Sequence, residues 1–178
     1  MGGKPVYLGF GCNMEGRWGD CSETFGTARS RLITRDCEIV ARSANYRSPA
    51  LGARAQPDFL NNVIAIQTSL PPIELLRALK SIERDAGRRK GPRWDSRSLD
   101  IDILDYRGLV LNWRSDGDTS RGAGLILPHP EMHKRAFVLK PLSDIAPVWR
   151  HPVLDAGARQ LLARIERQSR HSAVRNFS

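Results

Sequence analysis

Residues 99–103 alternate between apolar and acidic side chains, and this stretch constrains the fold more than any other. One set of alternate positions is apolar, and the other holds Asp100 and Asp102. A period of two is typical of a β-strand, whose successive side chains point to opposite faces. The two carboxylates would then share one face, with Cα atoms about 6.6 Å apart. At that spacing both can hold one hard cation or bridge a pair of cations.

Five basic residues lie in the ten-residue stretch 88–97 upstream of this acidic pair: Arg88, Arg89, Lys90, Arg93 and Arg97. Carboxylates that take a metal, beside guanidinium groups that fork onto phosphate oxygens, suit a metal-bound polyphosphate. The alternative interpretation is an exposed strand with a solvated charged face, because an isolated D-x-D motif marks a metal site only in a minority of cases. The acidic pair alone leaves both interpretations open.

The composition favours a single globular domain whose surface attracts anions. A chain of 178 residues can bury a sizeable core without disulfides, and we expect one domain over residues 1–178 with a helical or partly disordered tail at 156–178. The net charge of +9 fits nucleic acid, acidic lipid or a nucleotide and does not choose among them. Because no apolar stretch has the length of a membrane span or a signal peptide, we expect a cytoplasmic protein.

The chain has three cysteines, Cys12, Cys21 and Cys37. Their number is odd and their spacings match no zinc or redox pattern. We therefore expect ordinary reduced thiols, as is usual in the cytosol.

The rest of the chain predicts alternating strands and helices. The predicted strands cover residues 6–11, 37–43, 59–68 and 99–106. One helix is predicted to begin at a cap formed by Asp20 or Ser22, and a second near a cap at Ser69. Two further helices are predicted over 135–143 and 158–167, and residues 45–52 are predicted to form a loop. The order β-α-β-β-α-β predicts an α+β fold of the ferredoxin-like, split βαβ class. This class has an antiparallel sheet with helices on one face, here with additional C-terminal helices.

Five short blocks carry a more specific signal. They lie at residues 11–13, 46–49 with 56–61, 82–88, 93–102 and 128–139. Block by block and in order, they resemble the 6-hydroxymethyl-7,8-dihydropterin pyrophosphokinase family of folate biosynthesis. The resemblance spans about residues 5–155. One such block would be a weak signal, whereas five in sequence are hard to obtain by chance.

The resemblance implies an enzyme that transfers the terminal pyrophosphoryl group of ATP to the hydroxymethyl group of a reduced pterin, leaving AMP. Asp100 and Asp102 would hold two Mg²⁺ ions, with ATP as the co-substrate. The implied catalytic residues are Arg88, Arg97, Asp100 and Asp102. The implied ATP contacts are Glu83, Arg88, Trp94, Arg97, Ile103, His129 and Arg135.

The resemblance also implies a pterin site. Phe59 and Phe137 would stack on the two faces of the flat bicycle, and Asn61 would read its amide-like edge with both donor and acceptor. The full implied set is Ser48, Pro49, Leu51, Phe59, Asn61, Trp94 and Phe137. Without the resemblance, the two phenylalanines would by default be core residues, and Asn61 would be either structural or functional.

Two alternatives stay open beside the enzyme. A ferredoxin-like domain with a basic surface can be an RNA-binding module, and a relative of the family can bind nucleotide without turnover. An RNA-binding sheet is expected to expose aromatic residues among basic ones on its central strands. Here those strands carry Asn61 and an acidic pair instead. We therefore expect small-molecule substrates, and neither nucleic acid nor a membrane as partner.

Overall fold

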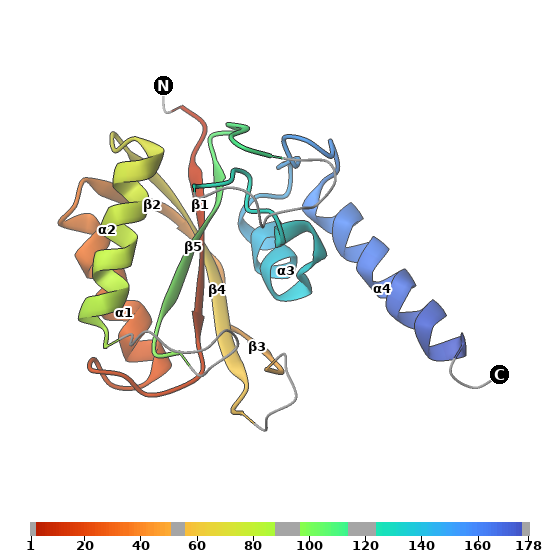
Figure 1. Ribbon diagram of the computed structural model, residues 1–178, viewed down its shortest axis with the longest axis horizontal. Coiled ribbons are helices and arrows are strands. Elements are labelled where there is room, and N and C mark those ends of the chain that lie inside the picture. Colours follow the sequence, from red (N-terminus) through yellow and green to blue (C-terminus); the bar gives the residue numbers. More distant parts are fainter. Residues whose placement is uncertain (1–2, 51–55, 88–96, 114–123, 176–178) are drawn as a thin grey trace.

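An antiparallel sheet of five strands forms the centre of the computed structural model, which describes residues 3–50, 56–87, 97–113 and 124–175 (Figure 1). Across the sheet, the order is β2 (Cys37–Arg42), β4 (Phe59–Thr68), β1 (Val6–Cys12) and β5 (Asp100–Tyr106). The short strand β3 (Tyr46–Ser48) also pairs with β4. Strand β1 thus lies between β4 and β5, so it holds them in a fixed register.

Helices lie on both sides of this sheet. Helices α1 (Cys21–Ile33) and α2 (Pro72–Asp85) cover one face, and α3 (Ala136–Ile145) and α4 (Ala158–Arg175) lie on the other (Figure 1). A 3₁₀ helix, η1 (Met132–Lys134), precedes α3. The sheet, the two covering helices and the additional C-terminal helices confirm the predicted fold class.

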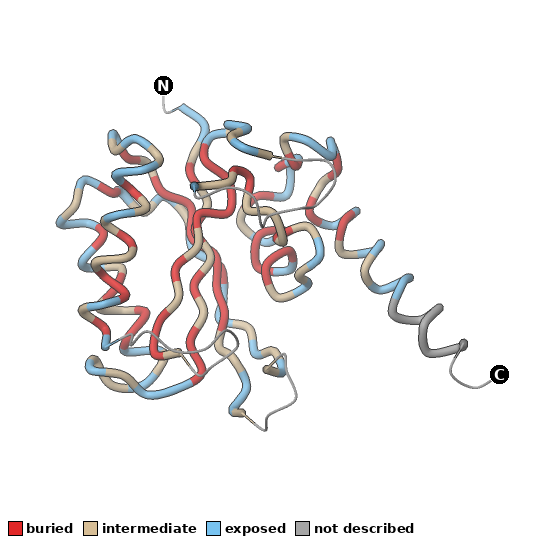
Figure 2. Tube along the Cα trace, in the orientation of Figure 1, coloured by how far each residue is buried: buried red, intermediate tan, exposed pale blue. Residues whose placement is uncertain are grey.

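Two apolar clusters hold these layers together. The larger one fills the space between the sheet and helices α1 and α2, and the smaller one joins α3 and α4 to the other face through residues such as Val63 and Leu104. Figure 2 shows the buried residues running along the central strands. Because the second cluster covers only part of its face, polar side chains of β4 and β5 remain available beside it.

Helix α1 begins where the sequence predicts. Asp20 is the N-cap residue, and its carboxylate accepts hydrogen bonds from the amides of Ser22 and Glu23 over 2.7 and 2.9 Å. The Glu23 carboxylate in turn accepts from the Asp20 amide over 2.9 Å. This reciprocal capping box satisfies amides that the helix itself cannot pair.

Helix α2 begins at a different cap from the predicted one. Its N-cap residue is Pro71, and Pro72 stands in the first turn, where an amide hydrogen would lack an intrahelical partner. Ser69 donates its hydroxyl to Asp36 instead of capping the helix, so that prediction is wrong. The helix ends before Gly87, as predicted, and the φ of 94° at Gly87 favours glycine.

Strand β3 is a second departure, because its residues were predicted to lie in a loop. Tyr46 pairs with Asn61, and Ser48 pairs with Phe59. The Tyr46 hydroxyl also donates to Asp144 on α3 over 2.5 Å. The partners of this short strand lie far along the chain, and together they fix the start of β4 beneath α3.

The cysteines are a third departure. Cys12, at the end of β1, forms a disulfide with Cys21, the first residue of α1, and their Cα atoms are 5.6 Å apart. The prediction that all three thiols are reduced is therefore wrong for this pair. Cys37 is free and buried. The bond closes the loop that leads from β1 into α1.

Histidine and tryptophan rings pack together beside α3 and α4. The buried His151 ring lies 5.1 Å from that of Trp113 and 5.8 Å from that of His133, centroid to centroid. Trp149 donates its indole N–H to the buried Asp105 over 2.6 Å. Burial, and then the proximity of His133, lowers the pKa of His151 to about 4. The cluster therefore favours neutral histidine.

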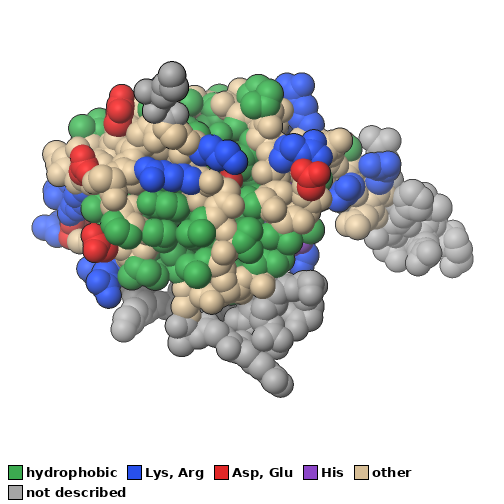
Figure 3. All heavy atoms as spheres, turned by 90° about the horizontal axis from the view of Figure 1, so that it is seen from above, with side chains coloured by type: hydrophobic (Ala, Val, Ile, Leu, Met, Phe, Trp, Pro, Cys, Tyr) green, Lys and Arg blue, Asp and Glu red, His purple; other side chains and the backbone are tan. Residues whose placement is uncertain are grey.

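One face of the molecule shows no single large group of basic side chains among those that the structure describes (Figure 3). On the face shown in Figure 3, Lys and Arg side chains form small separate groups with Asp and Glu between them. Among the described residues, no helix is long and apolar enough to cross a membrane.

We expect reduction of the Cys12–Cys21 disulfide to lower the free energy of unfolding by about 2–3 kcal/mol, because the bond restricts the unfolded chain. Urea denaturation with and without dithiothreitol measures the difference. Cys12→Ser should abolish it, whereas Cys37→Ser, which removes the free thiol, should preserve it. Three free thiols in the unreduced, unfolded protein would contradict the pairing.

We expect stability to fall between about pH 6.5 and pH 4, by up to about 3 kcal/mol from His151. In that window the unfolded state binds a proton at His151 and the folded state does not. In the parent protein, His151 Nδ1 accepts hydrogen bonds from the backbone amides of Val153 and Leu154, each over 3.2 Å. His151→Asn keeps a side-chain acceptor for these amides and removes the titrating ring. Urea denaturation at several pH values should show a flatter pH dependence for this variant. Parallel pH profiles would contradict the assignment.

Candidate active site

The register of β1 with its two neighbours forms the floor of the site. Gly11 lies directly between Asn61 of β4 and Asp100 of β5. Two residues further back along β1, Gly9 lies between Val63 and Asp102. The floor therefore consists of two parallel rows on one face of the sheet, Asn61–Gly11–Asp100 and Val63–Gly9–Asp102. In each row a glycine without a side chain separates a residue of β4 from an aspartate of β5.

The glycines keep this floor open. A Cβ atom built on Gly9 would come within 3.2 Å of the Leu104 side chain. At Gly11 it would point into the space between Asn61, Phe59 and Asp100. Above the glycines the structure has a cavity of about 190 Å³. The alternate glycines of β1 therefore leave space above the sheet in which a ligand could lie close to the backbone.

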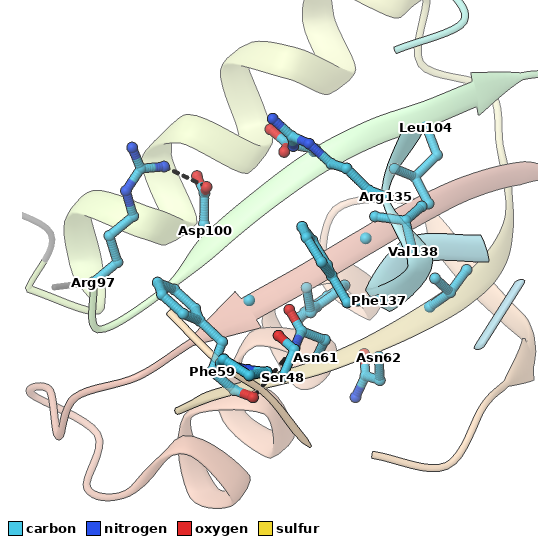
Figure 4. Close-up of a pocket in the computed structure, with 16 residues that line it drawn as sticks. Ser48, Phe59, Asn61, Asn62, Arg97, Asp100, Leu104, Arg135, Phe137 and Val138 are labelled. Atoms are coloured by element: carbon cyan, nitrogen blue, oxygen red, sulfur yellow. Dashed lines mark hydrogen bonds and ion pairs between the residues drawn. The ribbon is translucent and has the colours of Figure 1, made fainter. Parts of the chain in front are cut away.

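Two aromatic rings project into this cavity from opposite layers. Phe59 comes from β4 in the sheet, and Phe137 comes from α3 above it (Figure 4). Arg135 precedes α3, and its guanidinium carbon lies 5.9 Å from the centre of the Phe137 ring. The cavity thus has aromatic side chains from two elements and a cation near one of them.

Asn61 lies beneath the rings and is 4% exposed. Its amide nitrogen donates to the Ser48 hydroxyl over 2.9 Å and to the Phe59 carbonyl over 3.2 Å. The amide oxygen lies toward Gly11, at 3.8 Å from the Cβ position there. Because the donor is engaged by the protein, the carbonyl oxygen is the group offered to a ligand.

The acidic pair of β5 lies across the floor from Asn61. Asp100 forms an ion pair with Arg97, shown by the dashed line in Figure 4. Asp102 Oδ2 is 3.7 Å from Nε2 of His129. Burial lowers the pKa of His129, and Asp102 opposes that shift.

The carboxylates of Asp100 and Asp102 fit a hard divalent cation whose remaining ligands come from a substrate. Within the described residues, no group of three or more His, Cys, Asp or Glu side chains could hold a metal by itself. Mg²⁺ does not need such a group, since it is usually bound by one or two carboxylates together with water and substrate phosphates. Asp100 and Asp102 supply carboxylates on one face, with Arg97 beside them for phosphate oxygens.

Asn13 positions Arg97, and sequence reasoning assigned it no role. The side-chain oxygen of Asn13 accepts a hydrogen bond from the backbone amide of Arg97 over 2.7 Å, and the backbone amide of Asn13 donates to the Arg97 carbonyl over 3.0 Å. The side-chain nitrogen of Asn13 also donates to the Pro57 carbonyl over 3.3 Å. Asn13 therefore joins the chain before β4 to the chain before β5. The detectable signal was an asparagine directly after a glycine-bearing strand.

Most predicted site residues come together at the cavity. Those that line it are Ser48, Pro49, Phe59, Asn61, Arg97, Asp100, Asp102, Arg135 and Phe137. The cavity is completed by Gly9 and Gly11, whose alternate spacing in the sequence suggests close approach by another backbone or a ligand. The sequence did not single out the remaining lining residues: Phe10, Asn62, Val63, Leu104 and Val138. The alternation of β4 and β1 predicts shared faces, but it does not show which face the cavity occupies.

Three predicted residues do not line the cavity. One is His129, whose Nε2 nevertheless lies 3.7 Å from Oδ2 of Asp102, which does line it. The Ile103 side chain is buried in the core beneath α1 and α2. Glu83 is buried on α2, where it contacts Lys80 and the Ile101 amide. Three further predicted residues, Leu51, Arg88 and Trp94, lie outside the described part of the chain.

Comparison with known proteins agrees with this geometry. A family model described as 7,8-dihydro-6-hydroxymethylpterin-pyrophosphokinase matches residues 7–147. A protein of Methylorubrum extorquens named 2-amino-4-hydroxy-6-hydroxymethyldihydropteridine pyrophosphokinase is 41% identical over 143 residues, which are 80% of this chain and 82% of that protein. A protein of the same name from Aquifex aeolicus is 37% identical over 83% of this chain and 84% of its own.

The fold is also found in longer proteins. A crystal structure of HPPK-DHPS in complex with substrates superposes with a TM-score of 0.67 at 17% identity, over 90% of this chain and 43% of that chain. The match to the family model and the two relatives of similar length show that the chain belongs to the 7,8-dihydro-6-hydroxymethylpterin-pyrophosphokinase family.

Proposed function

We propose that this chain transfers pyrophosphate from ATP to 6-hydroxymethyl-7,8-dihydropterin, giving the pterin diphosphate and AMP in folate biosynthesis, and that it does so in the cytoplasm. The observation that carries the proposal is the row Asn61–Gly11–Asp100, which places an amide oxygen and a carboxylate on opposite sides of an open floor. The family supplies the reaction. The row supports separate positions for the two substrates, with the pterin near Asn61 and the triphosphate near Asp100.

The pterin fits the half of the cavity next to β4. Its bicycle would lie over Gly11 with Phe59 and Phe137 against its faces, because flat aromatic systems stack favourably on aromatic rings. The Asn61 oxygen would accept a hydrogen bond from the amide-like edge. Adjacent strands are about 4.8 Å apart, so the Cα atoms of Asn61 and Asp100 are about 10 Å apart across β1. The hydroxymethyl group would then point toward the carboxylates.

The triphosphate fits the half of the cavity next to β5. Asp100 and Asp102 would hold two Mg²⁺ ions, which when bound neutralise charge on the phosphates and help to activate the attacking hydroxyl. Arg97 and Arg135 supply guanidinium groups at this end of the cavity, and His129 lies against Asp102. The pterin hydroxyl oxygen forms a bond to the β-phosphorus, and the bond from that phosphorus to the AMP oxygen breaks.

The adenosine half of ATP would contact the outer edge of β5 and the residues that the resemblance implies. Because the Ile103 side chain is buried, a contact from Ile103 would come from its backbone on the outer edge of β5. Arg88 and Trp94 remain proposed ATP contacts, and Leu51 and Trp94 remain proposed pterin contacts, on the resemblance alone.

RNA binding is less compatible with this site. The two carboxylates on the sheet face would repel a nucleic-acid backbone unless metal ions intervened, and the expected exposed aromatic and basic side chains of an RNA-binding sheet are replaced here by Asn61 and the acidic pair. A relative that binds nucleotide without turnover would retain the arginines but would have no need for both carboxylates.

We expect Asp100→Ala and Asp102→Ala each to slow AMP formation by about a hundredfold to a thousandfold or more, because each removes charge stabilisation at the reacting phosphates. The measurement is AMP release from ATP with Mg²⁺, with and without the pterin. Glu38→Ala, an exposed carboxylate on β2, is the matched control and should behave like the parent. AMP formed at the parental rate by either aspartate variant would contradict the proposal.

We expect Phe137→Leu to weaken pterin binding about tenfold, because the variant keeps an apolar contact and loses the stacked ring. Calorimetric titration with the pterin measures this change, and AMP binding to the same sample should be unaltered. Equal losses for both ligands would show that the α3 contact was damaged as a whole, and would contradict the specific assignment of Phe137 to the pterin.

A further inference from the structure

Ile101 has an unusual place in the sheet, because it stands between the two acidic residues on a strand with one open edge. Strand β5 is the last in the order β2-β4-β1-β5, and it pairs with β1 along its inner edge. Within the described residues, no strand pairs with its outer edge at Ile101. An unpaired backbone amide at such an edge costs free energy unless another group accepts from it.

Two side chains of α2 take the place of a neighbouring strand at this residue. Glu83 Oε1 accepts a hydrogen bond from the Ile101 amide over 2.8 Å. Lys80 Nζ donates to the Ile101 carbonyl over 3.5 Å, and it pairs with Glu83 Oε1 over 2.6 Å. An acceptor and a donor thus meet the amide and the carbonyl of one residue, as a paired strand would.

The contact is made deep in the protein. Only 2% of the Glu83 side chain is exposed, against 37% for Lys80. Burial raises the pKa of Glu83, and Lys80 and the Ile101 amide oppose that shift. Burying the Glu83 carboxylate costs desolvation free energy, which its hydrogen-bond partners must offset. In the low dielectric of the interior these hydrogen bonds are electrostatically stronger than they would be at the surface, and they hold the carboxylate in one position.

We infer that Glu83 and Lys80 are positioning residues, which hold β5 at Ile101 and thereby set the spacing and direction of Asp100 and Asp102. Their effect on the reaction passes through the metal site and needs no contact with the nucleotide. The inference relies on the proposed function for the role of the two carboxylates, but its structural part does not.

The first test measures the Ile101 amide in the protein without substrates. We expect hydrogen exchange at this amide, followed by NMR, to be about tenfold to a hundredfold faster in Glu83→Ala than in the parent. Glu83→Gln retains an oxygen acceptor and should stay within about threefold of the parent. Asp85→Ala removes another ion-paired carboxylate of α2, whose partner is Arg35, and it is the matched control. Unchanged exchange in Glu83→Ala would overturn the inference.

The second test separates positioning from nucleotide contact. We expect Glu83→Ala to raise the Mg²⁺ concentration for half-maximal AMP formation about tenfold, with Glu83→Gln restoring most of the parental value. AMP binding in EDTA should be the same in all variants. Lys80→Met, at a partly exposed position, gives the same comparison if Glu83→Ala does not fold, and it should show a smaller shift in the same direction.

These measurements separate the positioning role of Glu83 from the proposed pyrophosphate transfer. Loss of AMP binding in EDTA by both Glu83 variants would mean that Glu83 contacts the nucleotide, and would overturn the positioning role. If the parent forms no AMP while the exchange result holds, the proposed function fails and the contact at Ile101 stands.

Discussion

The pairing of β1 with both β4 and β5 is the constraint on which the site depends. The side chains of one strand face alternate directions, so a slip of one residue would turn Gly9 and Gly11 toward the core. The same slip would separate Asn61 from Asp100, since both are aligned on Gly11. Apolar burial on the α1 and α2 side fixes this register, and the site occupies the opposite face because that face is less fully covered.

Contacts outside the cavity hold the two ends of the site in place. Asn13 joins Arg97 to the segment before β4, and the Tyr46 hydroxyl joins β3 to α3 at Asp144. Glu83 holds β5 from behind at Ile101. Asn13, Tyr46 and Glu83 come from three different parts of the chain. The geometry at Asp100 and Asp102 is therefore a property of the whole sheet and its α2 layer.

Local patterns predicted the elements, and distant contacts account for what was missed. The alternation at 99–103 and the apolar stretch of β4 correctly gave two strands, and Asp20 correctly gave a helix start. Strand β3 and the Cys12–Cys21 bond were missed because each depends on a partner brought near by the fold. Resemblance named Glu83 as a site residue, but only the structure shows that its carboxylate faces the Ile101 amide.

The most direct test of the account identifies which bond of ATP breaks. Phosphorus NMR of a reaction containing ATP, Mg²⁺, the hydroxymethyl dihydropterin and the protein resolves all phosphorus-containing products. Attack at the β-phosphorus, as the proposed function requires, gives AMP and a pterin diphosphate in equal amounts. Formation of ADP with a phosphate monoester, or of AMP with free pyrophosphate alone, would contradict it.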